Sequence, residues 1–83
     1  MDFELTRHAQ KAMEERGISM AWLEQVLTQP DLVVPDPDDP ALERRYRRIA
    51  EFGGRVLRVA INNTVEPARV VTVFFDRQMK DKL

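Results

Sequence analysis

Apolar residues in the N-terminal third of the chain recur at the i, i+3, i+4 spacing of one helix face. Thr6 stands where a helix N-cap is expected, and Gly17 stands where a left-handed residue commonly ends a helix. We therefore predict a first helix that begins at Thr6 and runs to about Arg16. Its apolar stripe consists of Leu5, Ala9, Ala12 and Met13.

A second helix is predicted over residues 20–28. Ser19 is its expected N-cap, and Pro30 ends it because proline disrupts a continuing helix. Since only residues 17–19 separate the two helices, we expect them to form an antiparallel pair. The apolar face of the second helix consists of Trp22, Leu23, Val26 and Leu27.

The C-terminal half has the pattern of β-strands. Two strands are expected at residues 43–52 and 55–62, where apolar and polar residues alternate in the second. A third strand is expected at residues 69–75, which are apolar at successive positions and hence typical of a central strand. The sequence therefore predicts one α+β domain over residues 1–83, with the helix pair on one face of an antiparallel sheet.

Two segments are less regular. Residues 32–34 form a short edge strand at most, because the acidic loop that follows contains three prolines up to Pro40. Residues 76–83 are polar and form either a frayed tail or a short helical turn.

Gly53-Gly54 separates the first two expected strands and is typical of a two-residue hairpin turn, since glycine readily takes a positive φ. Such a turn places Phe52 opposite Arg55 and sets the register of the pair. The apolar face of the second strand then meets the helices, and the predicted core includes Leu23, Val26, Leu57, Val59 and Ile61.

In this register Arg45, Arg47 and Arg58 share the opposite face of the sheet, whereas Tyr46 points inward; a three-residue loop would reverse the assignment. The distribution of charge along the chain also indicates that this face is basic. Residues 31–43 contain five acids and no base, and residues 44–58 contain six arginines and one acid. Either water solvates the three arginines or an anion neutralises them. The anion is expected to be RNA phosphate, the carboxylates of a partner protein, or the chain's own acidic loop at residues 36–40.

His8 and Arg16 are the other candidates for chemistry. Helical spacing puts Arg16 near the centre of the apolar stripe and His8 at its edge. Arg16 either pairs with a carboxylate or with carbonyls at a helix end, or it serves a site. His8 either packs against the sheet or acts as a general acid or base, because it is the only side chain here that titrates near neutral pH without a large shift.

The composition of the chain limits the kinds of site and segment that we expect. The chain has no cysteine and one histidine, so we expect no disulfide, no metal site and no cofactor. No stretch approaches the roughly 20 apolar residues of a membrane span, and the N-terminus lacks the pattern of a signal peptide. We therefore expect a cytoplasmic protein without a membrane segment, of unknown oligomeric state.

Two groups of motifs resemble an uncharacterised bacterial domain family. The N-terminal motifs are His8-Ala9 on the first helix and Arg16-Gly17-Ile18 before the second. The C-terminal motifs are the run from Gly54 to Val59 and the run from Val71 to Arg77, which resemble the last two strands of the family. That family is grouped with the RelE/ParE-like toxins, which include the BrnT-like proteins.

The resemblance implies a RelE/ParE toxin-like fold and a component of a bacterial toxin–antitoxin system. RelE-type members cut messenger RNA on the ribosome without a metal, and the matching catalytic candidates here are His8, Arg47, Arg58 and Arg77. Its partners would be RNA or the ribosome, together with an antitoxin. ParE-type members bind DNA gyrase instead, so the alternatives are a protein-binding module or a regulatory domain without toxicity. The near-neutral charge and the inward Tyr46 both differ from a RelE-type nuclease.

Overall fold

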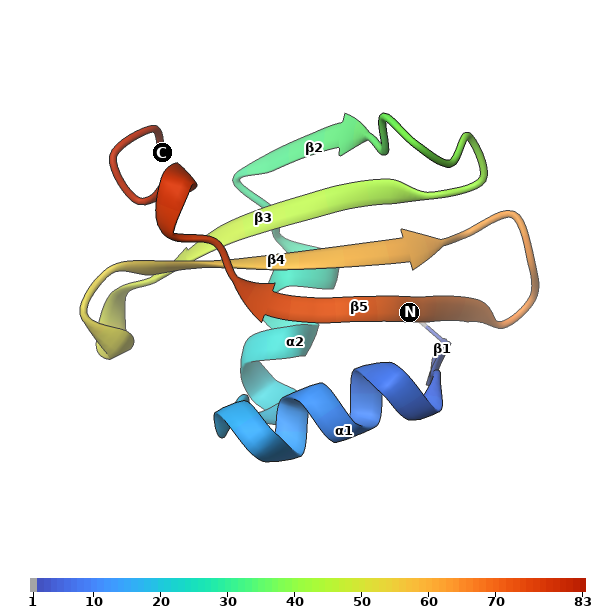
Figure 1. Cartoon of the computed structure of the whole chain (residues 1–83), viewed down its shortest axis with the longest axis horizontal. Helices are drawn as coiled ribbons and strands as arrows, with labels where there is room; N and C mark the ends of the chain where they lie inside the picture. The colour runs from blue at the N-terminus through green and yellow to red at the C-terminus, as the bar shows by residue number, and fades with distance from the viewer. Residues whose placement is uncertain (1) are drawn as a thin grey trace.

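Both predicted helices are present in the computed structural model, which describes residues 2–83, so that Met1 of the predicted domain lies outside it (Figure 1). The helices are α1 (Arg7–Arg16) and α2 (Met20–Thr28). Thr6 and Ser19 each accept a hydrogen bond from a backbone N–H in the following turn, at 3.1 Å in both cases. Gly17 ends α1 at φ 65°, where a side chain would be strained. The caps read from the sequence are confirmed.

The two helices lie on one face of a five-stranded sheet, with the strand order β1-β5-β4-β3-β2. The strands are β1 (Phe3–Leu5), β2 (Leu32–Pro35), β3 (Glu43–Ile49), β4 (Arg55–Asn62) and β5 (Ala68–Phe75). Strands β2 to β5 pair antiparallel, but β1 pairs parallel with β5. The sheet is therefore mixed, and the prediction of an antiparallel sheet is wrong because it lacked β1. Three residues are too few to show an alternating pattern.

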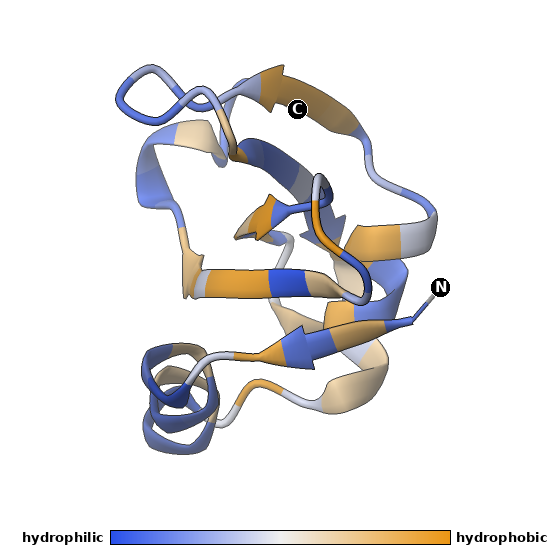
Figure 2. Ribbon diagram, turned by 90° about the vertical axis from the view of Figure 1, so that its right-hand side faces the viewer, coloured by the Kyte–Doolittle hydropathy of each residue, from blue (hydrophilic) through white to orange (hydrophobic). Residues whose placement is uncertain are grey.

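The helices also differ from the predicted antiparallel pair. α1 packs on β5 and β1, whereas α2 packs on β3 and β4. The two helices cross at a steep angle: α1 lies along the horizontal in Figure 1 and is seen nearly end-on in Figure 2, whereas α2 rises from the end of α1 toward the sheet. Each helix buries its apolar face on a different part of the sheet and not along the other helix.

The core between the helices and the sheet contains the residues expected from the sequence. Alternate residues of a strand point to the same face of the sheet, and residues 57, 59 and 61 of β4 join one buried cluster with residues of both helices. The predicted core residues Leu23, Val26, Leu57, Val59 and Ile61 are all fully buried. Within residues 2–83, neither helix has the length and apolar character needed to cross a membrane.

The connection from β3 to β4 is longer than the predicted two-residue turn. β3 ends at Ile49, and a short 3-10 helix, η1 (Ala50–Phe52), precedes Gly53 and Gly54. Both glycines have positive φ, as expected, but Ile49 and not Phe52 lies opposite Arg55. This displacement by three residues is odd, so it moves every side chain of β3 to the other face of the sheet.

Candidate nucleic-acid interface

Arg45 and Arg47 lie on the helix side of the sheet. In the observed register Arg45 is opposite Val59 and Arg47 is opposite Leu57, both of which belong to the core face. The predicted basic face, on which these two arginines join Arg58, is therefore wrong. The two-residue Gly53-Gly54 turn that we predicted leaves out η1. With η1 in the connection, β3 is displaced by an odd number of residues, and its two faces exchange sides.

The two arginines bind the C-terminal end of α2. Arg45 Nη1 donates a hydrogen bond to the carbonyl of Leu27 at 2.5 Å, and Arg47 Nη1 donates to the carbonyl of Gln29 at 2.6 Å. The last carbonyls of a helix lack partners within the helix and carry partial negative charge, so guanidinium groups stabilise them. Arg45 also pairs with Glu43, with 3.0 Å between Nε and Oε2. Both arginines therefore have a structural role, since they connect β3 to the end of α2.

Arg58 lies on the face of the sheet away from the helices, as predicted, and contacts an aromatic ring and a carboxylate there. Its guanidinium carbon lies 4.0 Å from the ring centroid of Phe74, and Nη1 lies 3.4 Å from a carboxylate oxygen of Asp76. Tyr46 is directly opposite Arg58, so it lies on this same face and not inward as predicted. Its side chain is nevertheless buried, at 5% exposure. Tyr46 and Arg58 are therefore neighbours.

The acidic loop pairs with Arg44, a residue outside the predicted cluster. One carboxylate oxygen of Asp36 accepts the backbone N–H groups of Asp38 and Asp39, at 2.9 and 3.0 Å, and the other lies 3.1 Å from Arg44 Nε. The N–H of Asp38 and then the Arg44 side chain hold the pKa of Asp36 below its usual range, against the effect of burial. The acidic loop thus pairs with Arg44, whereas Arg58 pairs with Asp76, and Arg45 and Arg47 donate to carbonyls at the end of α2.

His8 and Arg16 are both exposed on α1, so His8 is not packed against the sheet and Arg16 has no buried stem. They line one shallow hollow of about 170 Å³, together with Lys11, Ala12 and Glu15. Of the predicted catalytic residues His8, Arg47, Arg58 and Arg77, none of the first three lines the same hollow as Arg77. The structure therefore does not assemble the predicted catalytic set.

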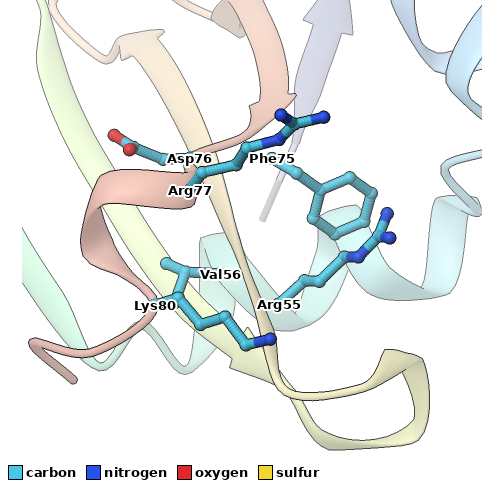
Figure 3. Close-up of a pocket in the computed structure, with 6 residues that line it drawn as sticks. All are labelled: Arg55, Val56, Phe75, Asp76, Arg77 and Lys80. Atoms are coloured by element: carbon cyan, nitrogen blue, oxygen red, sulfur yellow. The ribbon is translucent and has the colours of Figure 1, made fainter.

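Arg77 instead belongs to a basic pocket at the end of the sheet where β4 begins and β5 ends (Figure 3). The volume of this pocket is about 290 Å³. Figure 3 shows Arg55 and Arg77 extending toward the side where the ring of Phe75 lies, while the carboxylate of Asp76 points away from both. We name this site the basic pocket; it is lined by Arg55, Val56, Phe75, Asp76, Arg77 and Lys80.

The C-terminal tail completes the basic pocket. After β5 the chain forms a short 3-10 helix, η2 (Arg77–Met79), as one of the two predicted alternatives for this segment. The guanidinium of Arg48 donates hydrogen bonds to the carbonyls of Gly54, Lys80 and Leu83. These bonds join the tail to the start of β4, which is why Lys80 lies near Arg55.

Three aromatic rings lie beside the basic pocket. The ring centroids of Trp22 and Phe52 are 5.1 Å apart, those of Phe52 and Phe75 are 5.2 Å apart, and those of Trp22 and Phe75 are 6.1 Å apart. Phe52 keeps 36% of its surface exposed, and the guanidinium carbon of Arg55 lies 4.8 Å from its ring centroid. The aromatic cluster therefore reaches the protein surface next to Arg55.

This arrangement is suited to binding an anion. Within residues 2–83 the three cations of the pocket form no salt bridge, while its one carboxylate, Asp76, is paired with Arg58 outside it. Guanidinium and ammonium groups bind phosphate through charge-assisted hydrogen bonds. The described lining holds no histidine, so the pocket offers no side chain that ordinarily exchanges a proton near neutral pH.

Sequence reasoning named Arg77 and missed Arg55 and Lys80. Arg55 was visible as part of the basic segment, but nothing in the pattern placed it near the C-terminal tail. Lys80 belongs to a segment whose position depends on the contacts of Arg48, which no local pattern shows.

The comparisons with known proteins found one matching family. No curated protein and no solved structure matches the chain significantly. Residues 5–75 match the family described as "Domain of unknown function (DUF4258)". This match includes α1, α2 and all strands but β1, of which it contains only the last residue, and it ends before Arg77 and Lys80. Because it covers most of the 83 residues, the chain belongs to the DUF4258 family.

Proposed function

We propose that this domain binds RNA through the basic pocket, as the RNA- or ribosome-binding component of a system of the toxin–antitoxin type. The observation that carries the proposal is the grouping of Arg55, Arg77 and Lys80 around one hollow, where no carboxylate among the described residues forms a salt bridge with them. Positive charge clustered in this way attracts the phosphate backbone even when the net charge is −1, because the field depends on where the charges sit.

The aromatic rings favour RNA over a simple polyanion. Proteins that bind single-stranded nucleic acid combine a basic surface with aromatic side chains, on which bases stack. Phe52 and Phe75 supply such rings beside the cations. The resemblance to the RelE/ParE-like toxins, whose RelE-type members act on RNA with basic and aromatic residues near the last strand, supports the same proposal.

Binding, and not cleavage, is the activity that this geometry supports. Metal-free cleavage of RNA needs groups that move protons at the 2′-oxygen and at the leaving oxygen. His8 lines a separate hollow on α1, and Arg47 donates to the carbonyl of Gln29. Arginines in the basic pocket hold phosphate well but are poor proton donors, since a guanidinium keeps its proton in proteins.

The test is the affinity of the domain for a fluorescently labelled single-stranded RNA, measured by anisotropy. Substituting Arg55→Gln, Arg77→Gln or Lys80→Gln is expected to weaken binding several-fold each. Arg69→Gln is the matched control, because Arg69 is an exposed arginine on β5 opposite Asn62, at the far end of the strand from the basic pocket. Equal losses in Arg69→Gln and in the pocket variants would contradict a localised site.

A protein-binding module is the second candidate function, and the free edge of β2 favours it. β2 is the last strand of the sheet, and its outer backbone edge has no strand partner within residues 2–83. Val33 on this edge is 47% exposed, and a sheet edge can accept an extended segment of another protein, such as an antitoxin. Val33→Lys is expected to abolish such a complex while leaving RNA binding unchanged, as a pull-down with the co-expressed genomic neighbour would show.

A further inference from the structure

We propose that Arg55, held over the ring of Phe52, forms a stacking platform for one nucleobase, so that the basic pocket takes single-stranded and not duplex RNA. This inference rests on the proposed function and names the ligand class of the same site. The platform and the phosphate-binding cations are distinct parts of the site, and they respond to different substitutions.

The position of Arg55 is set by aromatic contacts. Its guanidinium carbon lies 4.8 Å from the centroid of the Phe52 ring, a distance at which the ring attracts the cation. Phe52 is itself held by Trp22 and Phe75, at centroid distances of 5.1 and 5.2 Å. Its backbone belongs to η1, the turn that displaced the register of β3. Arg55 thus lies beside a ring that is itself packed against two other rings.

Arg55 remains accessible to a ligand although it lies beside the Phe52 ring. Arg55 is exposed, and it lines the basic pocket of about 290 Å³ together with Arg77 and Lys80. A planar guanidinium stacks on a base as an aromatic ring does. A base on Arg55 would place the adjoining phosphate within the same hollow, where the two other cations lie (Figure 3).

Duplex RNA cannot use such a platform, because its bases are already stacked and paired inside the helix. A single strand presents the face of every base, so stacking adds affinity with little dependence on sequence. The structure therefore assigns the site to unpaired nucleotides and predicts tolerance of base identity.

The experiment compares three labelled ligands at one salt concentration: a single-stranded RNA, the same strand with abasic sites, and the duplex of the same sequence. Quenching of Trp22 fluorescence provides a second readout, since Trp22 is the only tryptophan and contacts Phe52. For the wild-type protein we expect the intact single strand to bind about tenfold more tightly than the abasic strand.

Substitutions separate stacking from charge. Arg55→Lys keeps the charge but removes the planar group, and Phe52→Leu removes the ring that supports it. Both are expected to reduce the tenfold preference for the intact strand to about twofold or less, while affinity for the abasic strand changes by less than about threefold. Arg77→Lys is the matched control and is expected to retain the preference. Circular dichroism melts confirm folding, and Arg55→Lys, being an exposed change, keeps the test valid if Phe52→Leu is unfolded.

The outcomes are distinguishable from those of the proposed function. Equal affinity of the wild-type protein for intact and abasic strands, or tighter binding of the duplex, would overturn the stacking platform while RNA binding stands. A preference that survives Arg55→Lys would overturn it as well. Absence of binding to all three ligands would overturn the proposed function and this inference together.

Discussion

Replacing Arg45 by methionine separates a structural role of this residue from a role in binding RNA. Methionine keeps much of the aliphatic length but removes the guanidinium. The carbonyl of Leu27 at the end of α2 then loses the Arg45 donor that lies 2.5 Å away, and the carboxylate of Glu43 loses the Arg45 contact at 3.0 Å but keeps its hydrogen bond from Asn63. Because the side chain of Arg45 is only 15% exposed, water restores these contacts poorly.

The expected loss follows from the contacts. A hydrogen bond to a charged group contributes about 1.5–3 kcal/mol, and a cation at a partly buried helix C-terminus contributes up to about 2 kcal/mol. These two figures describe the same contact and do not add. We expect Arg45→Met to lower the free energy of unfolding by about 2 kcal/mol, and thus the melting temperature by roughly 8–16 °C for a domain of this size.

Urea unfolding followed by the fluorescence of Trp22 measures this change, with the slope of the transition as a check on two-state behaviour. Arg69→Met, an exposed change on β5, should alter stability by less than about 0.5 kcal/mol. Unchanged stability of Arg45→Met together with lost RNA binding would refute the observed register and restore a two-residue turn at Gly53-Gly54.

Three further predictions concern the fold and its pH dependence. Asp36→Asn should lower stability at pH 7 and flatten the acid dependence; since the pKa of Asp36 is below its usual 3.8, its stabilisation is present above about pH 4 and is lost on acidification, as pH-dependent melts will show. Thr6→Ala removes the cap of α1 and should cost about 1 kcal/mol by urea unfolding, with Thr6→Ser as the variant that retains the hydroxyl. Leu57→Ala empties a fully buried position and should cost about 2–5 kcal/mol, so a loss under 1 kcal/mol would contradict its place in the core.

The helix caps and the bounds of β4 could be predicted from the sequence, because their signals come from neighbouring residues. Thr6 and Ser19 mark the starts of the helices by their own hydrogen bonds, and Gly17 marks an end by its φ. The bounds of β4 follow from alternation at residues 55–62. Such signals depend only on neighbours along the chain.

The register of β3 could not be predicted, because a distant contact decides it. Phe52 leaves the strand for η1 and packs on Trp22 from α2 and Phe75 from β5. The pattern of residues 43–52 continues through this point without a break. One misjudged turn then reversed the side assigned to Arg45 and Arg47, since strand periodicity is two.

The candidate site was predictable only in part for the same reason. Arg77 lies two residues after the end of the last strand, and the resemblance of its motif indicated it. Lys80 reaches the site because Arg48, on another strand, binds the carbonyls of Lys80 and Leu83. Charge alone showed that the hairpin was basic, and the tertiary structure shows which cations of the basic pocket form no salt bridge with any of residues 2–83.

The salt dependence of RNA binding tests the role of the basic pocket most directly. For single strands, each neutralised phosphate contributes about 0.7 to the slope of log affinity against log salt concentration. If Arg55, Arg77 and Lys80 each neutralise one phosphate, replacing all three with glutamine should reduce the magnitude of the slope by about 2. Arg69→Gln should leave the slope unchanged. A triple variant with the wild-type slope and affinity would contradict RNA binding at this pocket.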